Sequence, residues 1–183
     1  MDIQTAVSHL HHHRIRSGIL AGTLGIVVMA LGVPAAQAAV NCVVGPGVTQ
    51  TATTVTGTTG NDTIACGGAN PGKTIYGRAG NDTITGSRGN DALNGGPGLD
   101  TLTGSAGRDR LAGRRGNDTL SGGVGPDALA GGVGTDILHG NAGNDTLRGP
   151  SNDQRVDTLN GGAGSDTCQG PAPDGDTLVA CNP

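Results

Sequence analysis

The sequence predicts an all-β solenoid of stacked coils, and three observations point to that fold class. A nine-residue unit, Gly-x-x-Gly-x-Asp-x-[Ile/Leu]-x, repeats eight times in unbroken register over residues 77–148. A short fixed period is the sequence signature of a solenoid. The 183-residue chain holds 36 glycines and a single aromatic residue, Tyr76, which excludes a conventional core of large apolar side chains. Its fifteen acidic residues are all aspartates, and all but Asp2 lie at or beyond the first repeat-like segment.

The first segment of the chain, residues 1–38, is predicted to be a secretory signal peptide. Arg14 and Arg16 precede an apolar run over residues 19–31, and Ala-Gln-Ala at 36–38 provides a small-residue cleavage site. The apolar run is too short for a comfortable membrane span. We therefore expect a secreted, extracellular chain that has no membrane span after cleavage and that loses its clustered histidines with the leader.

Four cysteines remain after the leader, at Cys42, Cys66, Cys168 and Cys181. An even number of cysteines in an exported chain predicts disulfides. Pairing Cys42 with Cys66 and Cys168 with Cys181 is favoured, because each bond would close a short loop and seal one end of the stack. A four-cysteine zinc site is the alternative, but the Cys-x-x-Cys spacing typical of such sites is absent.

Each repeat is expected to fold as a six-residue turn followed by a three-residue strand. Glycines at positions one and four permit positive φ, and the Ile or Leu at position eight points inward because side chains alternate along a strand. Two repeats then make one 18-residue coil, and successive coils stack as parallel strands. This gives a cap segment over residues 39–56 and a repeat domain over 57–183, with strict repeats at 77–148 and an irregular, disulfide-linked cap at each end.

Stacking of the coils would place the aspartates in two columns. Asp82, Asp100, Asp118 and Asp136 would line one edge, and Asp91, Asp109, Asp127 and Asp145 would line the other. Like charges at strand spacing repel unless a cation lies between them. Calcium accepts six to eight oxygen ligands, including backbone carbonyls, in flexible geometry, whereas magnesium demands a stricter octahedron. The pattern therefore predicts several bound Ca²⁺ ions.

These repeats resemble the calcium-binding nonapeptide repeats of the repeats-in-toxin (haemolysin-type) family. Looser copies flank the strict ones at residues 57–65, at 161–169 and around Asp176. The resemblance implies a parallel β-roll with calcium held between neighbouring turns by the position-six aspartate and by backbone carbonyls. The predicted metal-binding aspartates are Asp62, Asp82, Asp91, Asp100, Asp109, Asp118, Asp127, Asp136, Asp145 and Asp166. The predicted metal-binding glycines are Gly77, Gly80, Gly86, Gly89, Gly95, Gly98, Gly104, Gly107, Gly113, Gly116, Gly122, Gly125, Gly131, Gly134, Gly140 and Gly143.

Three departures from the pattern carry further expectations. Lys73 stands where the aspartate belongs in a degenerate copy, so no full site is expected there. A three-residue insertion within residues 149–157 should bulge from one edge and weaken the site beside it, and Asp153 and Asp157 are left out of the ligand set. Position two is glycine in only some repeats, which should alter the rigidity of the turn more than ligation.

No catalytic apparatus is recognisable, and the chain is predicted not to be an enzyme. His139 is the only histidine after the leader, and there is no glutamate and no Gly-x-Ser-x-Gly motif. Residues 67–74 match the phosphate-binding loop pattern, but they lack the strand before and the helix after that such a loop requires. The net charge of −4 argues against nucleic-acid binding. The arginines near residues 108–115 are expected to offset the aspartates around them.

The leading function is a secreted calcium-binding structural protein that folds into the roll in extracellular calcium. Cytosolic calcium would leave the repeats empty, which suits export of an open chain. The alternative is a cell-surface adhesion, glycan-binding or ice-binding protein that uses an outward row of threonines, including Thr83, Thr101 and Thr119. A third possibility is an accessory module for a lyase or epimerase that acts on acidic polysaccharide. The partners expected besides calcium are therefore cell-envelope or polysaccharide components.

Overall fold

The computed structural model describes residues 42–68, 71–149, 155–169 and 175–181, and within these ranges it is all-β without any helix. The predicted signal peptide lies outside the described residues. The strands, in chain order, are β1 (Val43–Val44), β2 (Thr49–Gln50), β3 (Thr54–Thr56), β4 (Thr63–Ala65), β5 (Thr74–Tyr76), β6 (Thr83–Thr85), β7 (Ala92–Pro97), β8 (Thr101–Ala106), β9 (Arg110–Arg115), β10 (Thr119–Val124), β11 (Ala128–Val133), β12 (Ile137–Ala142), β13 (Thr146–Arg148), β14 (Thr158–Ala163), β15 (Thr167–Gln169) and β16 (Thr177–Val179).

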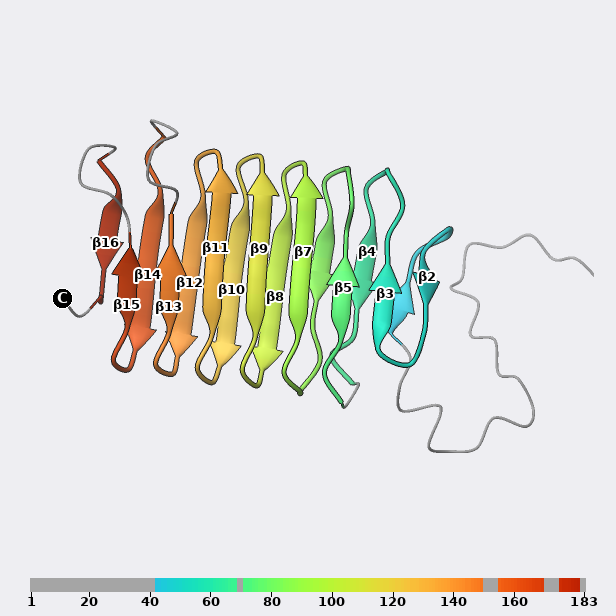
Figure 1. The fold of residues 1–183 in the computed structure, drawn as a ribbon, viewed down its shortest axis with the longest axis horizontal. Helices are drawn as coiled ribbons and strands as arrows, with labels where there is room; N and C mark the ends of the chain where they lie inside the picture. The colour runs from blue at the N-terminus through green and yellow to red at the C-terminus, as the bar shows by residue number, and fades with distance from the viewer. Residues whose placement is uncertain (1–41, 69–70, 150–154, 170–174, 182–183) are drawn as a thin grey trace, which may run out of the picture. The chain divides into compact units, whose positions relative to one another are not determined.

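Successive strands alternate between two sheets, which confirms the predicted parallel β-roll (Figure 1). We call them sheet A, in the order β1-β4-β6-β8-β10-β12-β14-β16, and sheet B, in the order β15-β13-β11-β9-β7-β5-β3-β2. From β3 and β4 onward, each strand pairs in parallel with the strand two further along the chain. In the central coils Leu102 lies beside Leu120, and Leu120 beside Leu138, so the coil repeats every two nonapeptides as expected.

The first coil is covered by two short antiparallel strands. β1 pairs with β4, with Val44 opposite Ile64, and β2 pairs with β3. These strands occupy the backbone donors and acceptors that each sheet would otherwise expose at this end, and exposed edges of that kind invite association with other chains. The parallel strands begin at β3, three residues before the expected start of the repeat domain at residue 57.

The core is a double file of position-eight side chains, as the alternation of side chains predicted. Ile84, Leu102 and Leu120 from sheet A and Leu93 and Leu111 from sheet B are at most 2% exposed. Each strand contributes one aliphatic side chain to its file, so the core is thin. Because so little apolar area is buried in each coil, the stacking of backbone hydrogen bonds must contribute much of the cohesion.

The central strands are longer than predicted. The strands β7 to β12 each span six residues, because backbone pairing continues from positions seven to nine into the first three residues of the next repeat. In β10, Gly123 and Val124 pair with Asn141 and Ala142 of β12. The prediction of three-residue strands was wrong here, because neighbouring coils adopt the same turn conformation and their backbones therefore stay within hydrogen-bonding distance.

The three-residue insertion does not disturb the stack. Leu138 of β12 lies beside Leu159 of β14, a separation of 21 residues instead of 18 along the chain, and Ile137 lies beside Thr158. The sheet register is therefore restored before β14 begins. Asp153 and the central part of the insertion lie outside the described residues.

Both favoured disulfides are present. Cys42 bonds to Cys66 across 24 residues, and Cys168 bonds to Cys181 across 13 residues. Cys168 occupies the position-eight place in β15, next to Leu147 of β13. Each bond therefore closes one end of the aliphatic file, and the rival zinc site is excluded because all four sulfurs are paired.

Loss of the N-terminal disulfide is expected to weaken the roll. Replacing both Cys42 and Cys66 with Ser should lower the free energy of unfolding by about 3 kcal/mol, because the bond restricts a loop of 24 residues in the unfolded chain. Chemical denaturation of this variant in calcium, beside a Cys168→Ser/Cys181→Ser variant, measures the effect. The Cys168–Cys181 bond closes a shorter loop and should contribute slightly less to the free energy of unfolding. An unchanged denaturation midpoint in the Cys42→Ser/Cys66→Ser variant would contradict the expectation.

Candidate metal centres

The aspartates form two columns, one along each edge of the roll, as predicted. In the first column the Asp100 backbone N–H donates to Oδ1 of Asp118 at 2.8 Å, and that of Asp118 donates to Asp136 in the same way. In the second column the Asp109 N–H donates to Asp127, and that of Asp127 to Asp145, again at 2.8 Å. One carboxylate oxygen of each aspartate is therefore committed to holding the next coil.

The second carboxylate oxygen of most column aspartates is buried without a hydrogen-bond donor. Within the described residues, the aspartates with a buried Oδ2 that lacks a hydrogen-bond donor include Asp82, Asp100, Asp109, Asp118, Asp127, Asp145, Asp166 and Asp176. A buried carboxylate oxygen with no partner is costly, since the charge loses its hydration and gains nothing in return. A repeated arrangement of such oxygens fits bound cations.

Two turns differ, because their own residues satisfy the aspartate. The Thr58 backbone N–H donates to Asp62 Oδ2 at 2.6 Å, and the Ser87 N–H donates to Asp91 Oδ2 at 2.5 Å. The Ser87 hydroxyl also donates to Asp91 Oδ1 at 2.9 Å. The predicted ligands Asp62 and Asp91 thus already have protein donors on both carboxylate oxygens.

The backbone at position two separates the two kinds of turn. Thr58 and Ser87 do not have positive φ. The position-two residue has positive φ in the turns that end at Asp82, Asp100, Asp109, Asp118, Asp127, Asp136, Asp145 and Asp166. Arg78 and Arg114 adopt φ of 86° and 94° although neither is glycine. Such strain costs of order 1–3 kcal/mol and is often retained at ligand-binding turns. In the two turns without positive φ, the backbone N–H of position two donates to the aspartate Oδ2.

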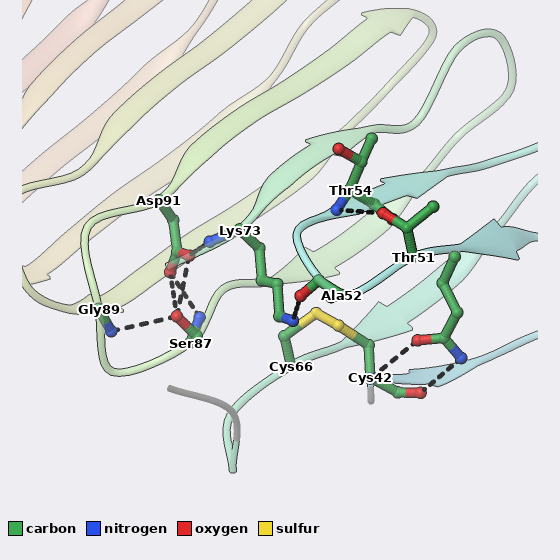
Figure 2. The surroundings of a disulfide bond; sticks show 10 residues. Cys42, Thr51, Ala52, Thr54, Cys66, Lys73, Ser87, Gly89 and Asp91 are labelled. Atoms are coloured by element: carbon green, nitrogen blue, oxygen red, sulfur yellow. Dashed lines mark hydrogen bonds between the residues drawn. A yellow bond between two sulfur atoms is a disulfide. The ribbon is translucent and has the colours of Figure 1, made fainter. Parts of the chain in front are cut away.

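Lys73 takes the place of an aspartate at the N-terminal end of the second column (Figure 2). Its side chain is 2% exposed, its backbone N–H donates to Asp91 Oδ1, and its ammonium donates to the Ala52 carbonyl. Burial lowers the pKa of the Lys73 ammonium, and the nearby Asp91 carboxylate opposes that shift. This supports the expectation that no full metal site forms at Lys73, and it shows how the end of the column is satisfied by protein groups.

The position-one glycines leave room where oxygens from two coils converge. A Cβ on Gly113 would collide with Asp118 Oδ2 and lie 2.7 Å from the Gly131 carbonyl oxygen, and a Cβ on Gly77 would collide with Asp82 Oδ2 in the same way. Within the described residues, no three side chains of His, Cys, Asp or Glu gather in one place. A cation at these turns must therefore take most of its ligands from backbone carbonyls, which suits calcium.

Burial and like charge make the unpartnered carboxylates hard to ionise. Desolvation raises the pKa of Asp82 from 3.8 to about 6, with the Asp100 and Asp62 charges adding to the rise and the Asp62 N–H opposing it. Desolvation likewise raises the pKa of Asp109 to about 7, and those of Asp118 and Asp127 to about 6. Without a cation, the folded columns therefore carry an electrostatic penalty near neutral pH.

The metal-free roll should consequently be more stable in mild acid than at neutral pH. The folded chain retains protons that the unfolded chain has lost, so this stability is fully present below about pH 4 and is lost as pH rises through about 6 to 7. Thermal unfolding in a chelator at pH 4.5 and pH 7.5, followed by circular dichroism, measures the difference. An equal or higher midpoint at pH 7.5 would contradict this account of the columns.

The columns extend beyond the predicted set. Asp157 is fully buried, its Oδ1 accepts from the Asp136 N–H at 2.8 Å, and its own N–H donates to Asp176 at 2.9 Å. Asp157 therefore continues the first column in register, 21 residues after Asp136. Sequence reasoning also missed a parallel ladder of position-five asparagines, in which Asn117 Oδ1 accepts from the Thr135 N–H. The recurrence of Asn before Asp was the signal available for it.

The chain was compared with known protein families, with curated proteins and with solved structures. The family model for the RTX calcium-binding nonapeptide repeat (4 copies) matches residues 49–70, 74–102, 94–129, 121–149 and 154–170. The comparisons with curated proteins and with solved structures gave no match. Nowhere in the described residues is there a helix long and apolar enough to cross a membrane. The matched segments contain the repeats whose aspartates form the two columns, and the chain belongs to the RTX calcium-binding nonapeptide repeat family.

Proposed function

We propose that this chain is a secreted structural protein whose repeats fold into the roll when they bind extracellular calcium. The observation that carries the proposal is the series of buried, unpartnered Oδ2 atoms along both columns. Each belongs to a carboxylate whose other oxygen already holds the neighbouring coil, as at Asp118 and Asp127. A cation bound there would satisfy the free oxygen and offset the charge that opposes stacking.

The proposed ligands are the aspartates with an unpartnered Oδ2, together with Asp136 and Asp157 of the same column and with carbonyl oxygens of the glycine turns around them. Bound calcium supplies positive charge and a flexible oxygen coordination shell. We leave Asp62 and Asp91 out of the proposed set, because Thr58 and Ser87 already donate to both. The N-terminal coil would then be held by protein donors and by the Cys42–Cys66 bond, independently of calcium.

Secretion follows from the same chemistry and from the leader sequence. Extracellular calcium modules bind at about 10⁻⁴–10⁻³ M, so the repeats would stay empty in the cytosol and fill outside the cell. Two disulfides among the described residues also fit an oxidising compartment. The proposed role is structural, since the roll is a calcium-binding domain type and no catalytic constellation is recognisable in the sequence.

A calcium titration followed by far-ultraviolet circular dichroism tests this proposal. Starting from the chain in chelator at pH 7.5, added calcium should increase β-signal in a cooperative transition with a midpoint of roughly 10⁻⁴–10⁻³ M. Magnesium at the same concentration serves as the control and should have a much smaller effect. Equal β-signal in chelator and in calcium would refute calcium-dependent folding.

The outward face of sheet A supports a second candidate function, adhesion through glycan or ice contacts. Thr83, Thr101 and Thr119 lie side by side on adjacent strands, and all three are exposed. A second row contains Thr85 and Thr103. Replacing the first three threonines with Tyr should abolish ice shaping or glycan binding if this face is used, whereas unchanged behaviour in both assays would remove the idea.

A further inference from the structure

In the part of the chain that the structure describes, the exposed charged side chains are all arginines, although the chain as a whole is negative. Among residues 42–68, 71–149, 155–169 and 175–181, every aspartate is buried except Asp176, which is half-buried. The exposed charged side chains in these ranges are Arg78, Arg88, Arg108, Arg110, Arg114, Arg115, Arg148 and Arg155. The formal net charge of −4 therefore misrepresents the surface that a partner meets.

The expectation that arginines near residues 108–115 offset nearby aspartates is not met. Arg108 and Arg110 are exposed, while Asp109 between them is fully buried in its column. Side chains alternate along a strand, so Arg110 points outward while its neighbour Leu111 fills the core; Arg114 and Arg115 are exposed as well. The arginines are left available to something outside the roll.

The arginines are distributed unevenly between the two sheets. The strands of sheet B include β9, with Arg110, Arg114 and Arg115, and β13, with Arg148. The strands of sheet A contain no Arg, Lys or Asp. Sheet A is therefore a neutral, threonine-rich face, and sheet B is a cationic one.

Neutral side chains hold two of the sheet B arginines in place. The Asn94 side-chain oxygen accepts from Arg114 Nη2 at 2.8 Å and Nε at 3.0 Å, in the amide orientation that satisfies both groups. On the neighbouring region of the sheet, Gln169 Oε1 accepts from Arg148 Nη2 at 3.0 Å and Nε at 3.1 Å. An amide partner orders a guanidinium without cancelling its charge, so both remain able to attract an anion.

Two depressions on the outer face of sheet B lie between these arginines. One, of about 520 Å³, is lined by residues that include Tyr76, Arg78, Arg114 and Arg115. The other, of about 330 Å³, is lined by Ala128 and Ala130 between arginines of β9 and β13. The small side chains of β11 form the floor of the second depression, so an elongated molecule could lie across several strands.

We propose that sheet B binds an acidic polysaccharide. Arginines on alternate strands, such as β9 and β13, stand roughly 10 Å apart, which suits a chain with a charged group on every second sugar. Tyr76 is 44% exposed and offers an aromatic surface for a sugar ring beside the Arg78 and Arg114 guanidinium groups. This site is separate from the calcium sites. It rests on the proposed function in one respect, because it requires the folded roll.

A nucleic acid fits this face less well. Tyr76 is the only aromatic residue of the chain, so there is no series of stacking surfaces for successive bases. The strands form a broad sheet surface and not a helix or a two-stranded ribbon that could enter a DNA groove. Anionic lipid vesicles lack the sugar ring that would explain the position of Tyr76.

The test measures binding of the purified chain, in calcium, to hyaluronan and heparin fragments by affinity electrophoresis and calorimetry. The triple variant Arg78→Gln/Arg114→Gln/Arg148→Gln should bind the better of the two ligands at least about tenfold more weakly. The control, Arg88→Gln/Arg108→Gln, removes two exposed arginines that line neither depression and should bind within about twofold of the parent. Neutral dextran should not bind.

Several outcomes would overturn the proposal. Binding of neither acidic glycan, equal losses in both arginine variants, or tighter binding to double-stranded DNA or anionic vesicles would each do so. Circular dichroism in calcium should be the same for all variants. If the parent chain showed no calcium-dependent folding, that result would count against the proposed function. The failure of calcium-dependent folding can therefore be distinguished from the failure of polysaccharide binding.

Discussion

Asp118→Asn is expected to make the chain less stable in calcium but no less stable in chelator. The carboxylate lies in the middle of the first column, with Oδ1 accepting from the Asp100 N–H and Oδ2 buried without a donor. Asn keeps the acceptor and the shape but removes the charge that a cation would neutralise. We expect the calcium concentration at the folding midpoint to rise about tenfold, equivalent to about 1.4 kcal/mol.

The behaviour in chelator gives this prediction its discriminating power. Without a cation, the buried Asp118 charge destabilises the fold because it has lost its hydration. The neutral amide should therefore leave the stability unchanged or raise it. The control is Asp91→Asn, whose carboxylate is satisfied by Ser87 and Lys73; it should lower stability in both conditions and leave the calcium dependence unchanged. Loss of stability at Asp118 in chelator equal to that in calcium would indicate a purely structural carboxylate.

Gly116→Ala should disrupt the stack of coils. Gly116 has φ of +124°, and a Cβ there would collide with the Gly98 carbonyl oxygen of the preceding coil. Neither the strained backbone nor the overlap can be relieved by rotating a side chain. The free energy of unfolding should fall by roughly 3–5 kcal/mol. Denaturant unfolding in saturating calcium measures this change.

The chain offers a matched control at the same repeat position. Gly60 also occupies position four of its turn, but it lacks positive φ, and a Cβ there would meet only the Thr58 hydroxyl, at 3.7 Å. Gly60→Ala should change stability by less than about 1 kcal/mol. Similar losses in the two variants would mean that the glycines matter for the flexibility of the unfolded chain and not for the close approach of coils.

The repeat was sufficient to predict the coil and the two columns. Position-eight aliphatic residues and position-six aspartates recur every nine residues, and stacking two repeats per coil fixes which of them become neighbours. The cysteine pairing followed from the positions of the four cysteines on either side of the repeats, and it is confirmed. In a solenoid, the sequence period determines which residues become neighbours in space.

What the repeat could not show was how individual turns differ. Ser87 and Ser105 occupy the same repeat position with the same side chain, yet Ser87 donates to Asp91 while Ser105 adopts φ of 92° and leaves Asp109 unpartnered. The two turns also differ in the preceding coil: Lys73 donates its N–H to Asp91, whereas an aspartate, Asp91, donates to Asp109. The separation of buried aspartates from exposed arginines likewise required the fold, because the residues alternate in the sequence.

Native mass spectrometry during a calcium titration tests the central claim most directly. The account predicts that several calcium ions bind to each chain, that they bind cooperatively, and that the compact charge-state distribution appears together with the loaded species. It also predicts that Asp118→Asn loses calcium at concentrations where Asp91→Asn remains loaded. A compact chain without bound calcium, or equal loading of the two variants, would contradict the assignment of calcium to the unpartnered carboxylates.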